Sequence, residues 1–400
     1  MAALSRRWVA RAVVVALPVI FCLLILELGV RLFCTSDEDG NLKFRDSRLK
    51  PYHAPARKAK RVIAQYLASK DSAIIYDPEL GWTLRPNVAH HNSAGFISSD
   101  SAVALEPSPG RLRIAAFGGS YTQGTFDKSW WRVLEDELNR SGVPAEVLNF
   151  GVDGYGMDQA YLRWKRDGAP WHPQIVIFGF AVVNCYDNLN LIRMIKDPET
   201  GIPFTKPRFV MEGDGLGLLN SPTPRPAEMP AIIANPAAWG PSAFDYYWVS
   251  QDFRYTWWRH SRLAAFAETK LSERSRLNRP ENFYRIGEEP AQLALRIVET
   301  FQTGVKASGS SFIVAHLPYD TELEALKEKG RFPHEELYAA LKSRVTVVSP
   351  EQAMLAACGG KVRAFFLNGH YIPEFQTVVG KEIAEFIRTH QESRPTVPTR

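Results

Sequence analysis

Five short apolar runs, separated by helix-like stretches, constrain the fold of this 400-residue chain more than any other feature. The helix-like stretches include residues 130–139 and 290–307. Alternation of buried strands with helices is typical of a parallel sheet that is covered on both faces. The sequence therefore predicts an α/β domain. Its strands are expected at residues 112–117, 146–150, 175–180, 311–316 and 345–348.

The first predicted strand runs directly into a serine flanked by glycines, in the stretch Gly118-Gly-Ser-Tyr-Thr-Gln-Gly124. Glycines permit a tight turn and close approach of a substrate, and a helix N-terminus favours developing negative charge. Ser120 is therefore a candidate nucleophile, although a strand-to-helix turn with a capping serine explains the same residues.

A candidate base lies near the other end of the chain. His370 is in a loop just before an apolar-periodic helix at residues 378–387. A serine hydroxyl needs a base to become a nucleophile, and histidine is the usual one.

Two further loops follow buried strands and contain Gly154 and Asn184. Because the carboxyl ends of parallel strands share one crevice, these residues and Ser120 are expected to converge. The backbone N–H groups of Ser120 and Gly154 and the amide of Asn184 would form an oxyanion hole.

Taken together, the blocks around Ser120, Gly154, Asn184 and His370 resemble the SGNH/GDSL hydrolase family, in which four separated blocks contribute these residue types in this order. The resemblance implies a flavodoxin-like, three-layer α/β/α fold without metal or organic cofactor. It also implies a nucleophile at Ser120, oxyanion donors at Gly154 and Asn184, and a general base at His370.

Within that family, the chain is most similar to the bacterial membrane-anchored, GDSL-type esterase-like group. The similarity lies in residues 77–87, beginning Asp-Pro-Glu-Leu-Gly-Trp, and in residues 92–96. The whole resemblance extends from residue 76 to residue 390.

The chain departs from the family pattern beside the histidine. Relatives have an aspartate two or three residues before it, whereas this chain has Asn368 and Leu367. An aspartate orients the imidazole and stabilises its cation. Three alternatives follow: a backbone carbonyl orients His370, another carboxylate substitutes, or the enzyme is slow. Asn368 itself is the candidate orienter nearest in sequence.

The N-terminus predicts a membrane anchor at residues 1–34. Residues 12–33 are almost entirely apolar, and Glu27 and Arg31 are spaced to form an i,i+4 pair. No signal-peptide cleavage pattern follows. Arginines before the apolar run favour a cytoplasmic N-terminus, so the remaining chain is expected outside the cytoplasmic membrane, reached by a single pass.

The rest of the chain divides into a juxtamembrane stalk at residues 35–75, an SGNH-like domain at 76–390 and a disordered tail at 391–400. Residues 190–290 are too long for an ordinary connection and are expected to be an inserted, aromatic-rich subdomain. Its aromatic residues, including Trp248 and Trp257, either bind substrate together with Tyr121 or simply pack a core.

Composition excludes several classes of function. The net charge of +5 is small and scattered, so no nucleic-acid partner is expected. The four cysteines have no metal-binding spacing.

The sequence thus predicts a membrane-anchored ester hydrolase, acting through a Ser-His acyl-enzyme on short acyl groups, such as acetyl, of surface or secreted polysaccharide. A polysaccharide O-acetyltransferase that uses the same site is the first alternative. A catalytically weak glycan-binding or scaffold protein is the second.

Overall fold

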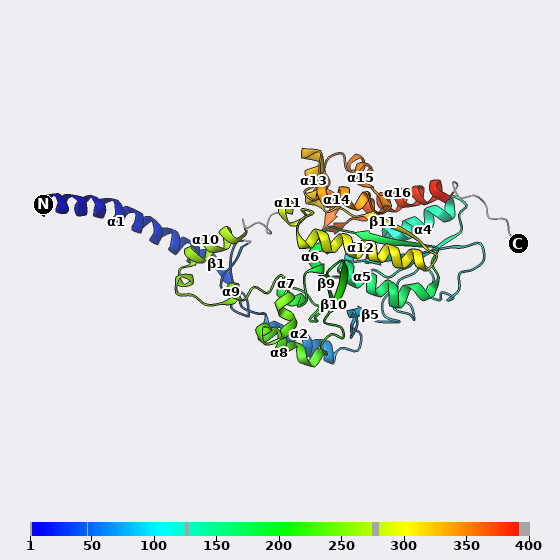
Figure 1. The fold of residues 1–400 in the computed structure, drawn as a ribbon, viewed down its shortest axis with the longest axis horizontal. Helices are drawn as coiled ribbons and strands as arrows, with labels where there is room; N and C mark the ends of the chain where they lie inside the picture. The colour runs from blue at the N-terminus through cyan, green and yellow to red at the C-terminus, as the bar shows by residue number, and fades with distance from the viewer. Residues whose placement is uncertain (1, 46, 125–127, 274–279, 392–400) are drawn as a thin grey trace.

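A five-stranded parallel sheet forms the centre of the molecule (Figure 1). The computed structural model describes residues 2–45, 47–124, 128–273 and 280–391. Its strand order is β12-β11-β8-β6-β7, which is the flavodoxin-like order predicted from the sequence. The strands are β6 (Leu112–Gly118), β7 (Ala145–Asn149), β8 (Ile175–Phe180), β11 (Ser311–His316) and β12 (Val347–Val348).

Both faces of this sheet are covered by helices, which confirms the predicted three layers. Side chains alternate between the faces along each strand, so Ile114 and Phe117 lie in different apolar cores. One core is closed by α4 (Trp130–Arg140) and α16 (Pro373–Gln391), and the other by α12 (Glu289–Ala307).

The remaining elements are short. The helices are α2 (Ala56–Ala68), α3 (Ser120–Gln123), α5 (Met157–Arg163), α6 (Asn184–Asn188), α7 (Arg193–Lys196), α8 (Met229–Ala234), α9 (Ser250–Phe253), α10 (Arg262–Glu273), α11 (Pro280–Phe283), α13 (Asp320–Lys329), α14 (Glu335–Lys342) and α15 (Glu351–Ala357). Outside the central sheet, a three-stranded sheet consists of β1 (Cys34–Ser36), β2 (Leu42–Phe44) and β3 (Ser47–Leu49). The other strands form pairs: β4 (Ile74–Asp77) with β5 (Gly81–Leu84), β9 (Arg208–Glu212) with β10 (Gly215–Leu219), and β13 (Phe366–Leu367) with β14 (His370–Tyr371).

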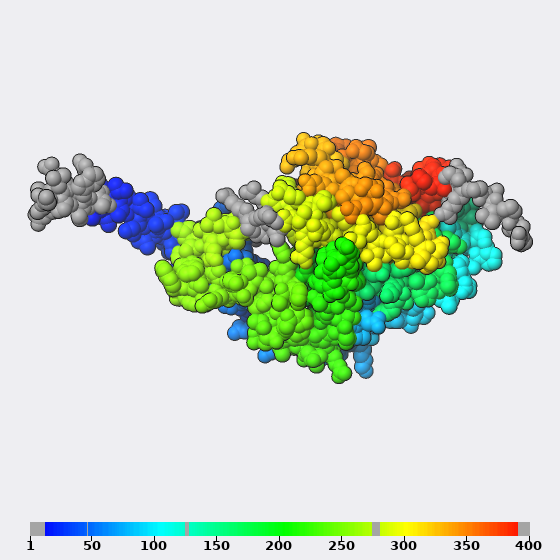
Figure 2. All heavy atoms as spheres, in the orientation of Figure 1, coloured from blue at the N-terminus to red at the C-terminus, as the bar shows by residue number. Residues whose placement is uncertain are grey.

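The first part of the insertion, residues 190–248, packs onto the main domain rather than around a separate core, whereas α10 contacts β3 and the end of the N-terminal helix α1 (Ala2–Phe33). Phe204 and Ile233 of this first part belong to the same apolar cluster as the sheet residue Ile114. Figure 2 shows this segment, in green, on the surface between the N-terminal helix and the sheet domain.

Residues 35–75, predicted as a stalk, are folded as well. They form the small sheet β1–β3 and helix α2, whose Ala59 and Ile63 are buried in the main core. Most of the predicted tail, residues 392–400, lies outside the described residues.

Helix α1 (Ala2–Phe33) projects from the rest of the molecule (Figure 1). Its segment Val13–Phe33 has 21 residues and a mean hydropathy of 2.8, so it is long and apolar enough to cross a membrane. Large apolar side chains such as Val14 and Leu24 are exposed along it.

The end of α1 is attached to the insertion through one carboxylate. Glu27 pairs with Arg31 at 2.6 Å, as predicted from their spacing. The same carboxylate accepts hydrogen bonds from Ser261 Oγ and from the backbone N–H groups of Arg262 and Leu263, at 2.8–2.9 Å. Glu27 therefore caps the N-terminus of α10, whose first N–H groups have no partner within the helix.

Replacing Glu27 by alanine should loosen the first turn of α10. Loss of a helix cap costs about 1 kcal/mol, so amide exchange at residues 262–265 should become about fivefold faster. Hydrogen exchange of the full-length chain in detergent measures this. The control Glu273→Ala removes a carboxylate that pairs with Lys270 at the other end of α10 and should leave those amides unchanged. Equal exchange in wild type and Glu27→Ala would contradict the capping role.

Candidate active site

Ser120 lies at the turn between β6, an inner strand of the sheet, and the short helix α3, which follows Gly119. A Cβ atom on Gly119 would lie 3.1 Å from both Asn184 Nδ2 and Tyr155 O. The glycine therefore allows the turn to sit against the loops that follow β7 and β8. The strand-to-helix turn considered from the sequence is present, but Gly119 rather than Ser120 is the N-cap of α3, and Ser120 is the first residue of the helix.

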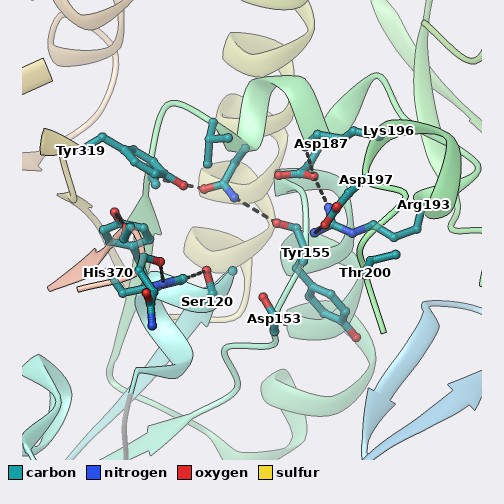
Figure 3. Close-up of a pocket in the computed structure, with 18 of the residues that line it drawn as sticks. Ser120, Asp153, Tyr155, Asp187, Arg193, Lys196, Asp197, Thr200, Tyr319 and His370 are labelled. Carbon is teal, nitrogen blue, oxygen red and sulfur yellow. Dashed lines mark hydrogen bonds and ion pairs between the residues drawn. The ribbon is translucent and has the colours of Figure 1, made fainter. Parts of the chain in front are cut away.

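His370 lies beside this serine, although the two are 250 residues apart in the sequence. Its Nε2 is 2.8 Å from Ser120 Oγ, and its Nδ1 is 3.1 Å from the backbone oxygen of Asn368 (Figure 3). A carbonyl oxygen can only accept a hydrogen bond, so Nδ1 carries the proton. In the neutral ring, Nε2 is then the bare nitrogen, ready to accept the Ser120 hydroxyl proton.

The backbone at Asn368 explains how its carbonyl reaches the ring. Asn368 has φ of 50° and Gly369 has φ of 76°, so both residues of the tight β13–β14 turn are left-handed. Asparagine and glycine adopt this conformation more readily than other residues. Of the three alternatives that the sequence leaves open, this geometry matches a backbone carbonyl as the orienter of His370.

Tyr121 holds the histidine loop in place. Its hydroxyl donates a hydrogen bond to the backbone oxygen of Gly369, and its ring centroid lies 5.1 Å from that of His370. Trp130 Nε1 donates to the backbone oxygen of Tyr121 at 3.0 Å. Burial raises the pKa of Tyr121, so its hydroxyl remains a donor. The side chain lines the cavity, but its polar atom is directed at the loop.

The three predicted oxyanion donors line the same cavity as Ser120 and His370. Asn184 Nδ2 donates one hydrogen bond to Tyr155 O at 2.9 Å, and its Oδ1 accepts one from Ala181 N at 3.2 Å. An amide nitrogen carries two protons, so one remains for a ligand. Gly154 has φ of 75° in the loop after β7. The N–H of Ser120 lies in the first turn of α3, where it has no helical acceptor.

A charged wall forms the other side of this cavity of about 390 Å³ (Figure 3). Asp187 accepts hydrogen bonds from Arg193, at 2.8 Å, and from Lys196. Burial lowers the pKa of Lys196, and the Asp187 carboxylate opposes this effect. Asp153, Asp197 and Thr200 complete the polar lining.

Sequence reasoning did not identify this wall. The available signal was the spacing of Asp187, which follows Asn184 by three residues on α6 and therefore lies on the same side of that helix.

The two tryptophans proposed as substrate contacts lie outside the cavity lining. Trp248 packs against Phe253, with 4.2 Å between ring centroids, and is partly buried against the core. Trp257 is 78% exposed in the short helical turn before α10. Of the residues predicted as site residues, the structure therefore gathers all except these two.

No family model matches this chain. No curated protein matches it either. Among solved structures, the chain is similar to an acetylxylan esterase from Geobacillus stearothermophilus, with a TM-score of 0.36 and 10% identity over 72% of this chain and 97% of that one. It is also similar to a candidate GDSL-like lipase from Parabacteroides merdae, with a TM-score of 0.36 and 10% identity over 68% and 94% of the chains. A candidate acylhydrolase from Bacteroides fragilis has a TM-score of 0.35 and 14% identity over 71% and 90%. These TM-scores are low, so the roles of residues depend on the geometry of the site itself.

Replacing Gly119 by alanine should disturb the packing of Asn184 against the turn. The added Cβ would lie 3.1 Å from two polar atoms, which is too close, and overpacking of this kind costs about 1–3 kcal/mol. Thermal unfolding of the full-length protein should show a lower Tm. At Gly240 a Cβ meets no atom within 4 Å, so Gly240→Ala is the matched control. Identical melting of the two variants would refute the close approach at Gly119.

Proposed function

We propose that this protein is a membrane-anchored serine ester hydrolase of the SGNH/GDSL type, which forms an acyl-enzyme on Ser120. The observation that carries the proposal is the 2.8 Å contact between Ser120 Oγ and the bare Nε2 of His370. A serine hydroxyl and a correctly protonated imidazole at this distance are the minimum that nucleophilic acyl transfer requires. The helix Val13–Phe33 is the proposed anchor, with the catalytic domain outside the cytoplasmic membrane.

The reaction proceeds in two halves. Ser120 Oγ attacks the ester carbonyl carbon while His370 Nε2 takes the hydroxyl proton, which the imidazolium then gives to the departing alcohol as the carbon–oxygen bond breaks. Water next attacks the acyl-enzyme, loses its proton to Nε2 and releases the acid, with the proton returned to Ser120. The N–H groups of Ser120 and Gly154 and the Asn184 amide stabilise the oxyanion in both halves.

A carbonyl in place of the usual carboxylate changes the electrostatics of the histidine. In a serine protease, changing the aspartate to asparagine lowers turnover by about 10⁴ because the imidazole adopts the wrong tautomer. Here the Asn368 carbonyl fixes the productive tautomer, because it accepts from Nδ1. It offers only a dipole to the imidazolium, so we expect the enzyme to be active but slower than one with a carboxylate.

The cavity favours a polar ester over a lipid. Asp187, Arg193 and Lys196 would have to be covered by a long acyl chain, and burying charged groups against hydrocarbon is costly. A short acyl group on a hydroxyl-rich molecule leaves them hydrated or hydrogen-bonded. The proposed substrates are therefore short acyl esters, such as acetyl, on a surface or secreted polysaccharide.

Hydrolysis of a p-nitrophenyl ester of acetate by the full-length protein in detergent tests this function. Ser120→Ala and His370→Ala should each lower kcat/KM by at least about a thousandfold, because the two groups act as a unit. Ser250→Ala changes a surface hydroxyl that is hydrogen-bonded to Gln251 and should retain wild-type activity. Wild-type activity equal to that of Ser120→Ala would overturn simple ester hydrolysis.

The same acyl-enzyme would support O-acetyl transfer if a sugar hydroxyl replaced water in the second half. A hydrolase releases acetate at a rate that is independent of added glycan. If release is slow alone and acetyl groups appear on an added oligosaccharide, the protein is an acetyltransferase. If glycan binds but Ser120→Ala has no effect on either assay, the protein is a binding or scaffold protein.

The role of the Asn368 carbonyl predicts the effect of removing its side chain. Asn368→Gly keeps the carbonyl and tolerates φ of 50°, so kcat should stay within about threefold of wild type. Initial rates against ester concentration measure this. A loss of more than about a hundredfold in a folded variant would show that the amide side chain takes part in catalysis.

A further inference from the structure

A second cluster of reactive side chains is buried at the carboxyl end of β11, and none of its three residues lines the cavity. His316, Glu322 and His334 are each at most 5% exposed. One potential ligand atom from each lies within 4.8 Å of the other two. The cluster joins the end of β11 to α13 and to the segment before α14, which are drawn in orange in Figure 1.

The imidazole rings of His316 and His334 approach each other with their Nε2 atoms. His316 Nε2 lies 3.4 Å from His334 Nε2. Two nitrogens that bind one tetrahedral zinc ion at about 2.0–2.1 Å lie about 3.3–3.4 Å apart. The spacing is therefore that of two ligands of a single ion, and the nearby carboxylate of Glu322 supplies a third.

When the His316 ring is neutral, its surroundings leave Nε2 without a proton. Its Nδ1 is hydrogen-bonded to the carboxylate of Glu351, which also accepts a hydrogen bond from the Tyr338 hydroxyl at 2.5 Å. An ionised carboxylate has no proton to donate and can only accept a hydrogen bond. Nδ1 of His316 therefore carries the ring proton, and Nε2 carries a lone pair. Histidine ligands of metals characteristically donate their other N–H to a carboxylate in this way.

His334 is incompletely satisfied without an ion. Its Nδ1 has no hydrogen-bond partner among the described residues, and the nearest Glu322 oxygen is 3.7 Å away. If Nε2 of His334 donates to His316, Nδ1 is left as an unpaired buried acceptor, which costs about 1–3 kcal/mol. A cation bound by both Nε2 atoms takes the place of the N–H···N contact, and the ring proton of His334 then lies on Nδ1, on the side where Glu322 Oε1 is 3.7 Å away.

Aromatic rings fix both imidazoles. The ring of Phe332 stacks on His334, with 5.0 Å between centroids and an interplanar angle of 24°. The ring of Tyr338 lies 4.4 Å from that of His316. The ligands are thus held in orientation by packing, as a preorganised site requires.

We propose that His316, Glu322 and His334 bind one divalent transition-metal ion, for which zinc is the best match. Imidazole and carboxylate ligands suit zinc. The backbone N–H of Tyr319 donates to Glu322 Oε2 at 2.8 Å, so the fourth tetrahedral position is left to water. This site is distinct from the proposed catalytic one, although Tyr319 of the cavity wall lies between His316 and Glu322 in the sequence. The ion would therefore help to hold Tyr319 in the cavity lining, because the Tyr319 backbone N–H donates to Glu322 Oε2.

The sequence analysis predicted no metal. The three ligands are spaced 6 and 12 residues apart, which matches no recognised zinc motif, and only the fold brings them together.

The test is the metal content of full-length protein produced with added zinc and dialysed exhaustively in detergent. Wild type should retain about one zinc per chain, and His334→Gln and Glu322→Gln should retain less than about a tenth of that. The matched control is His91→Gln, a buried histidine that contacts the Arg85 carbonyl elsewhere in the fold. It should retain zinc like wild type.

Chelation of the wild-type protein provides a measurement that does not depend on the folding of variants. Removal of zinc should lower the Tm by several degrees, and added zinc, but not magnesium, should restore it. The proposal is overturned if folded wild type retains and rebinds less than a tenth of an equivalent of zinc, cobalt or nickel. It is also overturned if His91→Gln loses as much metal as the two ligand variants.

Discussion

The hydrogen bond between Ser120 and His370 depends on packing at both of its ends, because the two residues are 250 positions apart. The serine end is fixed by the sheet, since β6 is an inner strand with neighbours on both sides. The histidine end is fixed by side chains that reach across from other elements. Tyr371 donates to the backbone oxygen of Pro318 at 2.7 Å, and Gln376 accepts from the backbone N–H of Trp130 at 2.9 Å.

The histidine loop holds the His370 ring through backbone carbonyls rather than through a carboxylate. Two consecutive left-handed residues turn the Asn368 carbonyl toward Nδ1, and the Tyr121 hydroxyl holds the next carbonyl, that of Gly369. In the proposed reaction, backbone geometry would perform the orienting role that an acidic side chain performs elsewhere. The imidazolium formed in that reaction would be less stable than one beside a carboxylate, because a carbonyl dipole attracts the cation more weakly than a full negative charge does.

Much of the sheet and most of the site could be predicted from the sequence, because local patterns encode them. Strand composition located β6 and β8, and the glycines beside Ser120 marked the turn. Contacts made only by the tertiary fold could not be predicted. Glu27 was expected to pair with its helical neighbour, yet it also caps α10, more than 230 residues later. Trp257 was predicted to contact substrate only because it is aromatic, and aromatic character does not say where in the fold a side chain lies. In the structure it is exposed and lies outside the cavity lining.

The most direct test of the central claim is the reaction of the full-length protein with a fluorophosphonate, followed by mass spectrometry of its peptides. Such a reagent phosphonylates a serine only when a neighbouring base activates its hydroxyl. The geometry predicts a single adduct on Ser120 in wild type, and formation of that adduct should be at least about a hundredfold slower in His370→Ala. No adduct on folded wild type, or an adduct on Ser120 that forms equally fast without His370, would contradict the account.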